Sequence, residues 1–160
     1  MASLFDKAAL GSLELQNHLV IAPMTRSRAT DNIPNALMAE YYGQRSSAGL
    51  IISEGISPSP NGLGYPRIPG LFSSAQVKGW KACTAAAHAG GAKIFAQLMH
   101  CGRVVHPLNM PVGARAVAPS ALGIPGEMYT DAQGMQPHPV PEAMSVQDIN
   151  DAITEYATAA

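Results

Sequence analysis

The chain has 160 residues, of which 47% are hydrophobic and 13% charged, and its formal net charge is −1. This length and composition favour one globular domain and exclude an intrinsically disordered chain. No basic stripe offers itself to nucleic acid, and no apolar run approaches the roughly 18 residues that a membrane helix needs. The two cysteines, Cys83 and Cys101, form no disulfide framework. We therefore expect a soluble, cytoplasmic protein without nucleic-acid or membrane partners.

The first part of the chain predicts a hairpin, a strand and a helix. Residues 4–17, LFDKAALGSLELQN, suggest a small hairpin around Gly11 and Ser12. Residues 18–23, HLVIAP, form a short apolar run with β-branched residues that ends at a proline, as in a buried strand. Residues 35–49 contain helix formers and predict a helix that Gly49 ends.

Two further apolar strands follow, separated by a loop and a second helix. The strands are expected over 50–55, LIISEG, and 92–98, AKIFAQL, and residues 57–70 form a loop with four prolines and three glycines. Ser73 with Gln76 three residues later predicts a capping box at the start of a helix. This helix should run to about Ala89, where Gly90 and Gly91 end it.

The last part of the chain combines a long connection with a third helix. Residues 101–144 are rich in proline and show no sustained period, so we expect a long excursion without regular elements, of the kind that is often functional. Ser145 and Asp148 predict a helix start, and the chain stops inside the helical pattern that follows. We interpret residues 1–160 as the N-terminal portion of a single domain, truncated within a helix.

Apolar strands that alternate with helices predict an α/β fold of parallel β/α units. Three strands do not close a barrel, and a complete eight-stranded β/α barrel needs roughly 250 residues. In such folds ligands bind beyond the carboxyl ends of the strands, which here are residues 22–26, 53–55 and 97–100. The primary amide of Gln97 both donates and accepts hydrogen bonds, which suits a ligand edge that alternates N–H and C=O groups, such as the pyrimidine end of a flavin.

Four sequence blocks in this order resemble the old yellow enzyme family of FMN-dependent ene-reductases: LFD…NHLVIAPMTRSRA, AEYYGQRSSAGLIISEG, GLGYPRIPGLFS…QVKGWK and AQLMHCGRVVH. The resemblance covers about residues 3–160. It implies the N-terminal half of a TIM barrel with FMN at its mouth. It also implies hydride transfer from NADPH or NADH through flavin N5 to the β-carbon of an activated alkene.

The resemblance also implies roles for individual residues. Pro23, Met24 and Thr25 would lie along the flavin ring, and the Thr25 hydroxyl would tune the redox potential and reach toward the substrate. Gly55 would let the backbone approach the flavin, and Gln97 would pair with the pyrimidine edge. Tyr65 and Met99 would line the substrate side.

Met99 departs from the family pattern, because an aromatic residue, most often Trp, is usual at this position. The ligands of the substrate carbonyl, the tyrosine proton donor and the main phosphate site would belong to a complementary C-terminal half. We therefore expect that half as a partner and expect this chain alone to be inactive.

Other interpretations remain open from the sequence. His100, Cys101 and His106 suggest a metal site or a cysteine nucleophile, but their spacing matches no standard zinc pattern, and we predict no metal. The chain could instead be a non-catalytic fragment that associates without flavin. It could also be half of a related FMN barrel, similar to a dienoate reductase.

Overall fold

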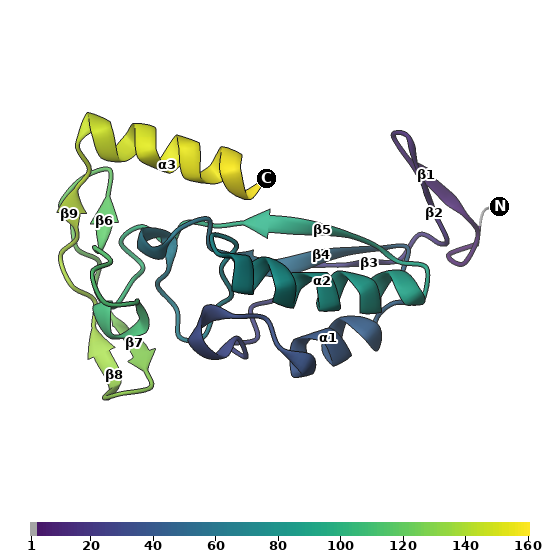
Figure 1. Cartoon of the computed structure of the whole chain (residues 1–160), viewed down its shortest axis with the longest axis horizontal. Coiled ribbons are helices and arrows are strands. Elements are labelled where there is room, and N and C mark those ends of the chain that lie inside the picture. Colours follow the sequence, from purple (N-terminus) through teal and green to yellow (C-terminus); the bar gives the residue numbers. More distant parts are fainter. Residues whose placement is uncertain (1–2) are drawn as a thin grey trace.

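The computed structural model describes residues 3–160 and has a three-stranded parallel sheet at its centre. Its strands are β3 (Val20–Ile21), β4 (Leu50–Ile56) and β5 (Lys93–Leu98), in the order β3-β4-β5. Helices α1 (Ala36–Gly43) and α2 (Ser74–Ala89) lie together on one face of this sheet (Figure 1). The predicted parallel β/α units are therefore confirmed.

The N-terminal hairpin is also confirmed. β1 (Ala8–Leu10) pairs antiparallel with β2 (Leu13–Leu15), and the turn contains Gly11 at a φ of +58°, a conformation that favours glycine. Figure 1 shows this hairpin at one end of the molecule, whereas α3 (Val146–Ala159) begins at the other.

The hydrophobic core lies between the sheet and the two helices. Ile21, Ile51 and Ile94 are register partners on the three strands, and all three pack in the cluster that contains Tyr42 of α1 and Trp80 of α2. The opposite face of the sheet lacks such a layer, because Val20 and Phe95 remain 55% and 44% exposed. In a closed barrel this second face would turn toward the barrel interior.

The helix ends follow the predicted signals in part. The hydroxyl of Ser73 accepts a hydrogen bond from the Gln76 N–H, but the Gln76 side chain accepts from the Phe72 N–H rather than completing the box. α1 ends at Gly43, so the predicted end at Gly49 was wrong. Gly49 has another role, because a Cβ at this position would collide with the carbonyl oxygen of Asn17.

The long excursion contains regular elements, so the prediction of none over 101–144 was wrong. A parallel pair joins β6 (Val117–Ala118) to β9 (Glu142–Ala143), and an antiparallel hairpin joins β7 (Glu127–Thr130) to β8 (Gly134–Pro137). The strands are too short to produce a period in the sequence. Among residues 3–160, short 3₁₀ helices complete the connections: η1 (Thr30–Asn32), η2 (Pro60–Gly62) and η3 (Pro107–Asn109).

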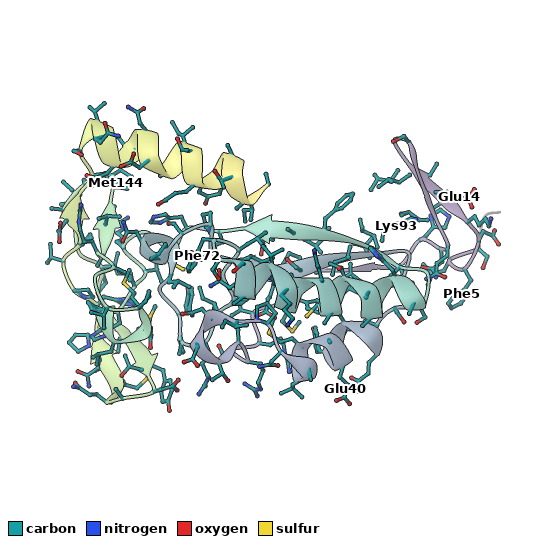
Figure 2. All side chains as sticks on the ribbon, viewed as in Figure 1. Phe5, Glu14, Glu40, Phe72, Lys93 and Met144 are labelled. Atoms are coloured by element: carbon teal, nitrogen blue, oxygen red, sulfur yellow. The ribbon has the colours of Figure 1, made fainter. Side chains whose placement is uncertain are left out.

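The last helix, α3 (Val146–Ala159), begins with the predicted box, in which Ser145 and Asp148 exchange side-chain and backbone hydrogen bonds. Arg115 fixes this start by ion pairs to Glu142 at 3.0 Å and Asp148 at 3.2 Å. No residue of α3 is buried, and the side chain of Ile153 is 63% exposed. Figure 2 shows side chains along its outer side that no other element covers. Within residues 3–160, no helix is long and apolar enough to cross a membrane.

Candidate functional site

The structure brings the three predicted strand ends to one edge of the sheet. Gly55 of β4 is the register partner of Gln97 of β5, and the Met99 N–H donates to the Ile56 carbonyl at 2.8 Å. β3 runs parallel to β4, so the segment that follows it reaches the same edge. There the Arg26 N–H points to the carboxylate of Glu54, at 3.5 Å. The three segments therefore form one contiguous site.

An irregular segment follows β3 and contains Pro23, Met24 and Thr25. All three residues are exposed. The Thr25 hydroxyl has no hydrogen-bond partner within residues 3–160, and the sulfur of Met24 contacts the guanidinium of Arg26 at 3.4 Å. This segment thus presents a free hydroxyl donor in front of the strand ends.

Gln97 presents its carboxamide at the end of β5. Its side chain is exposed and has no hydrogen-bond partner in the described part of the chain, whereas its backbone N–H donates to the Ser53 hydroxyl at 3.0 Å. The amide is therefore held by its backbone and free at its tip, as a ligand contact requires. A role that only satisfies buried backbone groups does not fit an exposed amide.

Gly55 and Met99 are in direct contact. A Cβ at Gly55 would lie 2.5 Å from the Met99 methyl carbon and 2.8 Å from its sulfur. Gly55 is buried, and its φ is not in the left-handed region, so the space that it leaves is filled by Met99. The structure gives a packing reason for this glycine in addition to the predicted approach of a ligand.

Tyr65 lies on the loop between β4 and α2, and its side chain is exposed. The loop is held by Arg67, which donates to the Ser27 carbonyl at 3.1 Å and pairs with Asp131 of the β7–β8 turn at 2.7 Å. Asn109 adds hydrogen bonds to the carbonyls of Gly64 and Tyr129. A cavity of about 480 Å³ lies between this loop and the β7–β8 hairpin, and Tyr65 forms part of its wall.

The buried environment of Cys101 does not favour a cysteine nucleophile. Burial raises the pKa of the Cys101 thiol to about 11, so very little thiolate exists at neutral pH. Burial also lowers the pKa of His100, whose Nδ1 accepts a hydrogen bond from the Gly102 N–H at 3.0 Å. Among residues 3–160, no group of three or more His, Cys, Asp or Glu side chains could hold a metal ion.

Comparison with known proteins decides the family. Residues 3–160 match the model of the NADH:flavin oxidoreductase / NADH oxidase family. The chain belongs to this family. Its members include the old yellow enzymes, and a solved old yellow enzyme homologue from Zymomonas mobilis superposes with a TM-score of 0.91 at 45% identity. That match covers 99% of this chain and 44% of the homologue.

Relatives from other organisms agree with this assignment. The flavin oxidoreductase hxnT of Emericella nidulans is 38% identical over 98% of the chain, which corresponds to 41% of its own length. A probable flavin mononucleotide-dependent alkene reductase of Leishmania infantum is 37% identical over 94% of the chain and 43% of its length. The chain therefore spans less than half the length of these relatives. Its sheet corresponds to part of the TIM barrel of the old yellow enzymes.

In this member of the flavin oxidoreductase family, the sequence alone does not reveal two buried polar residues of β4 behind the strand ends, Ser53 and Glu54. The sequence pattern places Ser53 and Glu54 at a strand end and assigns them no role, yet both are only 1% exposed. Burial raises the pKa of the Glu54 carboxyl, and hydrogen bonds from Arg26 and Tyr42 oppose that shift. A serine and a glutamate inside an otherwise apolar strand were the available signal.

Proposed function

We propose that this chain supplies the flavin-ring side of an FMN-dependent ene-reductase that takes hydride from NADPH or NADH and reduces an activated alkene. One observation carries the proposal: in a member of the flavin oxidoreductase family, a free hydroxyl follows β3 and a free carboxamide lies at the end of β5, the two strands that flank β4. FMN, when bound, supplies the hydride relay between nicotinamide and alkene. The alkene reductase relative supports the substrate class.

The residues present fit a flavin ring. Pro23 and Met24 would lie along the ring, and the Thr25 hydroxyl would donate to a flavin carbonyl. The exposed carboxamide of Gln97 would pair with the pyrimidine edge, where one N–H and one C=O stand side by side. Gly55, as the register partner of Gln97, would keep the backbone close to the same edge.

The substrate would lie on the side of Tyr65 and Met99, with Thr25 in reach. Tyr65 offers an aromatic surface with a polar tip, and Met99 an adaptable apolar one. The groups that hold the substrate carbonyl and donate the proton would come from outside residues 1–160. We therefore propose that this chain is the N-terminal portion of one barrel domain, which a complementary C-terminal half completes.

Co-expression tests this proposal. The chain would be produced together with the C-terminal part of the Zymomonas mobilis homologue that its match does not cover. We call this assembly the completed barrel, and we expect it to bind FMN, seen as absorbance near 450 nm. It should also oxidise NADPH or NADH when an enone or enal is added. A completed barrel that is folded but takes up no FMN would refute the proposed function.

Gln97→Ala should raise the dissociation constant of FMN in the completed barrel. The change removes the carboxamide, and each hydrogen bond lost is worth roughly 0.5–1.5 kcal/mol, so a loss of affinity of about five- to a hundredfold is expected for two bonds. Gln97→Glu is the matched comparison: it keeps the side-chain shape but replaces the amide donor with an acceptor and adds a negative charge, so it should weaken FMN binding as well. Fluorescence titration with FMN measures the effect, and an unchanged constant in Gln97→Ala would disprove this assignment.

Met99→Trp should change substrate selectivity and leave FMN content nearly unaltered. The larger ring would narrow the pocket on the substrate side and would also press on the space beside Gly55. We expect kcat/KM for a bulky enone to fall relative to kcat/KM for a small enone. Steady-state kinetics with each alkene measure this ratio. Met99→Leu is the matched control. Loss of flavin with the same selectivity would show that Met99 only packs against Gly55.

A further inference from the structure

An irregularity in β4 lies at the centre of the candidate site. Ile52 pairs with Phe95 and Gly55 with Gln97, so Ser53 and Glu54 together oppose the single residue between those partners. Such a β-bulge bends the strand and re-aims the groups around it, and bulges are common beside active sites. Both residues of this bulge, Ser53 and Glu54, are polar and almost completely buried, so the bulge carries two polar side chains inside the fold.

The first of them, Ser53, holds the β5 side. Its hydroxyl accepts the backbone N–H of Gln97 at 3.0 Å and donates to the carbonyl of Glu54 at 2.8 Å. The Gln97 N–H is therefore bonded to a side chain in the interrupted part of the ladder. The direction in which the Gln97 side chain projects from β5 therefore depends on the position of this hydroxyl.

The second, Glu54, contacts the segment that follows β3. The Tyr42 hydroxyl donates to one carboxylate oxygen at 3.4 Å, and the Arg26 N–H points to the other at 3.5 Å. The Glu54 N–H in turn donates to the Tyr42 hydroxyl at 3.1 Å, so α1 and the bulge are joined in both directions. Arg26 directly follows Thr25, and the carboxylate thereby fixes the segment that carries the Thr25 hydroxyl.

We propose that the Ser53–Glu54 bulge is the positioning element of the flavin site, with Ser53 placing Gln97 and Glu54 placing Thr25. Neither side chain needs to touch the cofactor, because each acts through a neighbour whose hydrogen-bonding group is exposed. This inference rests on the proposed function, since it assumes that Thr25 and Gln97 contact FMN. It adds that the distance between these two contacts is set by one buried irregularity of β4.

A double-mutant cycle separates positioning from general stability. In the completed barrel, Glu54→Gln should lower the FMN reduction potential and slow flavin reduction by roughly two- to tenfold, the effect of weakening one hydrogen bond. In a Thr25→Ala background the same change should shift neither quantity, because the group that Glu54 positions is gone. Glu40→Gln is the matched control. Its carboxylate projects from α1 away from the sheet (Figure 2) and should change nothing in either background.

A second measurement covers the case in which Glu54→Gln fails to fold. Ser53→Ala should accelerate hydrogen exchange at the Gln97 amide in the completed barrel and raise the FMN dissociation constant by roughly two- to tenfold. Ser59→Ala, a change at a buried serine that caps η2, is the control and should leave the Gln97 amide protected.

Two results would overturn this inference. One is an equal shift of potential by Glu54→Gln with and without the Thr25 hydroxyl, which would indicate a purely structural role. The other is unchanged exchange at Gln97 in Ser53→Ala. Failure of the unsubstituted completed barrel to bind FMN would refute the proposed function instead, so the two failures can be told apart.

Discussion

Produced without any other polypeptide, residues 1–160 are expected to form oligomers and to bind no FMN. Within the described residues, β3 and β5 each have one neighbour in the sheet, so each leaves an unpaired edge. Val20 and Phe95 are exposed on the open face, and α3 exposes Val146, Ile149 and Ile153. Unpaired strand edges and clusters of exposed apolar side chains drive association.

Analytical ultracentrifugation and FMN titration measure this result, with the completed barrel as the positive control. Ile149→Gln with Ile153→Gln should reduce association of the chain alone, because these changes remove exposed apolar side chains from α3. The pair Thr154→Gln with Thr158→Gln, on the same helix, should not. A monomeric, cooperatively folded chain with FMN bound and no partner would contradict the expectation.

The second large effect is expected at Thr25. In the completed barrel, Thr25→Ala should lower the FMN reduction potential and slow flavin reduction by NADPH or NADH. The hydroxyl would donate to a flavin carbonyl that gains negative charge on reduction, and a hydrogen bond to a charged group is worth roughly 1.5–3 kcal/mol. If the whole of that energy appears in the barrier, the rate falls by about ten- to a hundredfold.

Stopped-flow absorbance at 450 nm and a dye-equilibrated potential titration read this effect. Thr25→Ser keeps the hydroxyl and should remain close to the unsubstituted protein, whereas Thr25→Val keeps the shape and should behave like Thr25→Ala. The reoxidation of flavin by the alkene should slow less, or accelerate, because the reduced state is no longer stabilised. A potential that rises in Thr25→Ala would exclude this role.

The sheet and its helices could be predicted because their signals are local. The apolar runs around Ile51 and Ile94, and the caps at Ser73 and Ser145, depend on residues close together in the sequence. The end of α1 could not be predicted in the same way. Gly49 looked like a helix terminator, but its reason is the carbonyl of Asn17, a contact across 32 residues.

The sequence indicated the exposed groups of the candidate site and not the buried residues behind them. Thr25 comes shortly after one strand and Gln97 lies at the end of another, and polar residues at the ends of parallel strands indicate a candidate ligand site directly from the sequence. The bulge at Ser53 and Glu54 depends on pairing with β5 and on Tyr42 of another element, so no local pattern contains it. The same holds for Arg67, whose partner Asp131 is 64 residues away.

The sheet order also limits how copies of this chain could combine. β3 and β5 lie at the two edges of the sheet and both run parallel to β4. The β5 strand of one copy can therefore pair in parallel with the β3 strand of the next copy. Each copy adds three strands, however, and eight is not a multiple of three. Head-to-tail stacking of identical copies therefore gives six or nine strands and never an eight-stranded ring. Closure at eight strands requires a different polypeptide segment that contributes five.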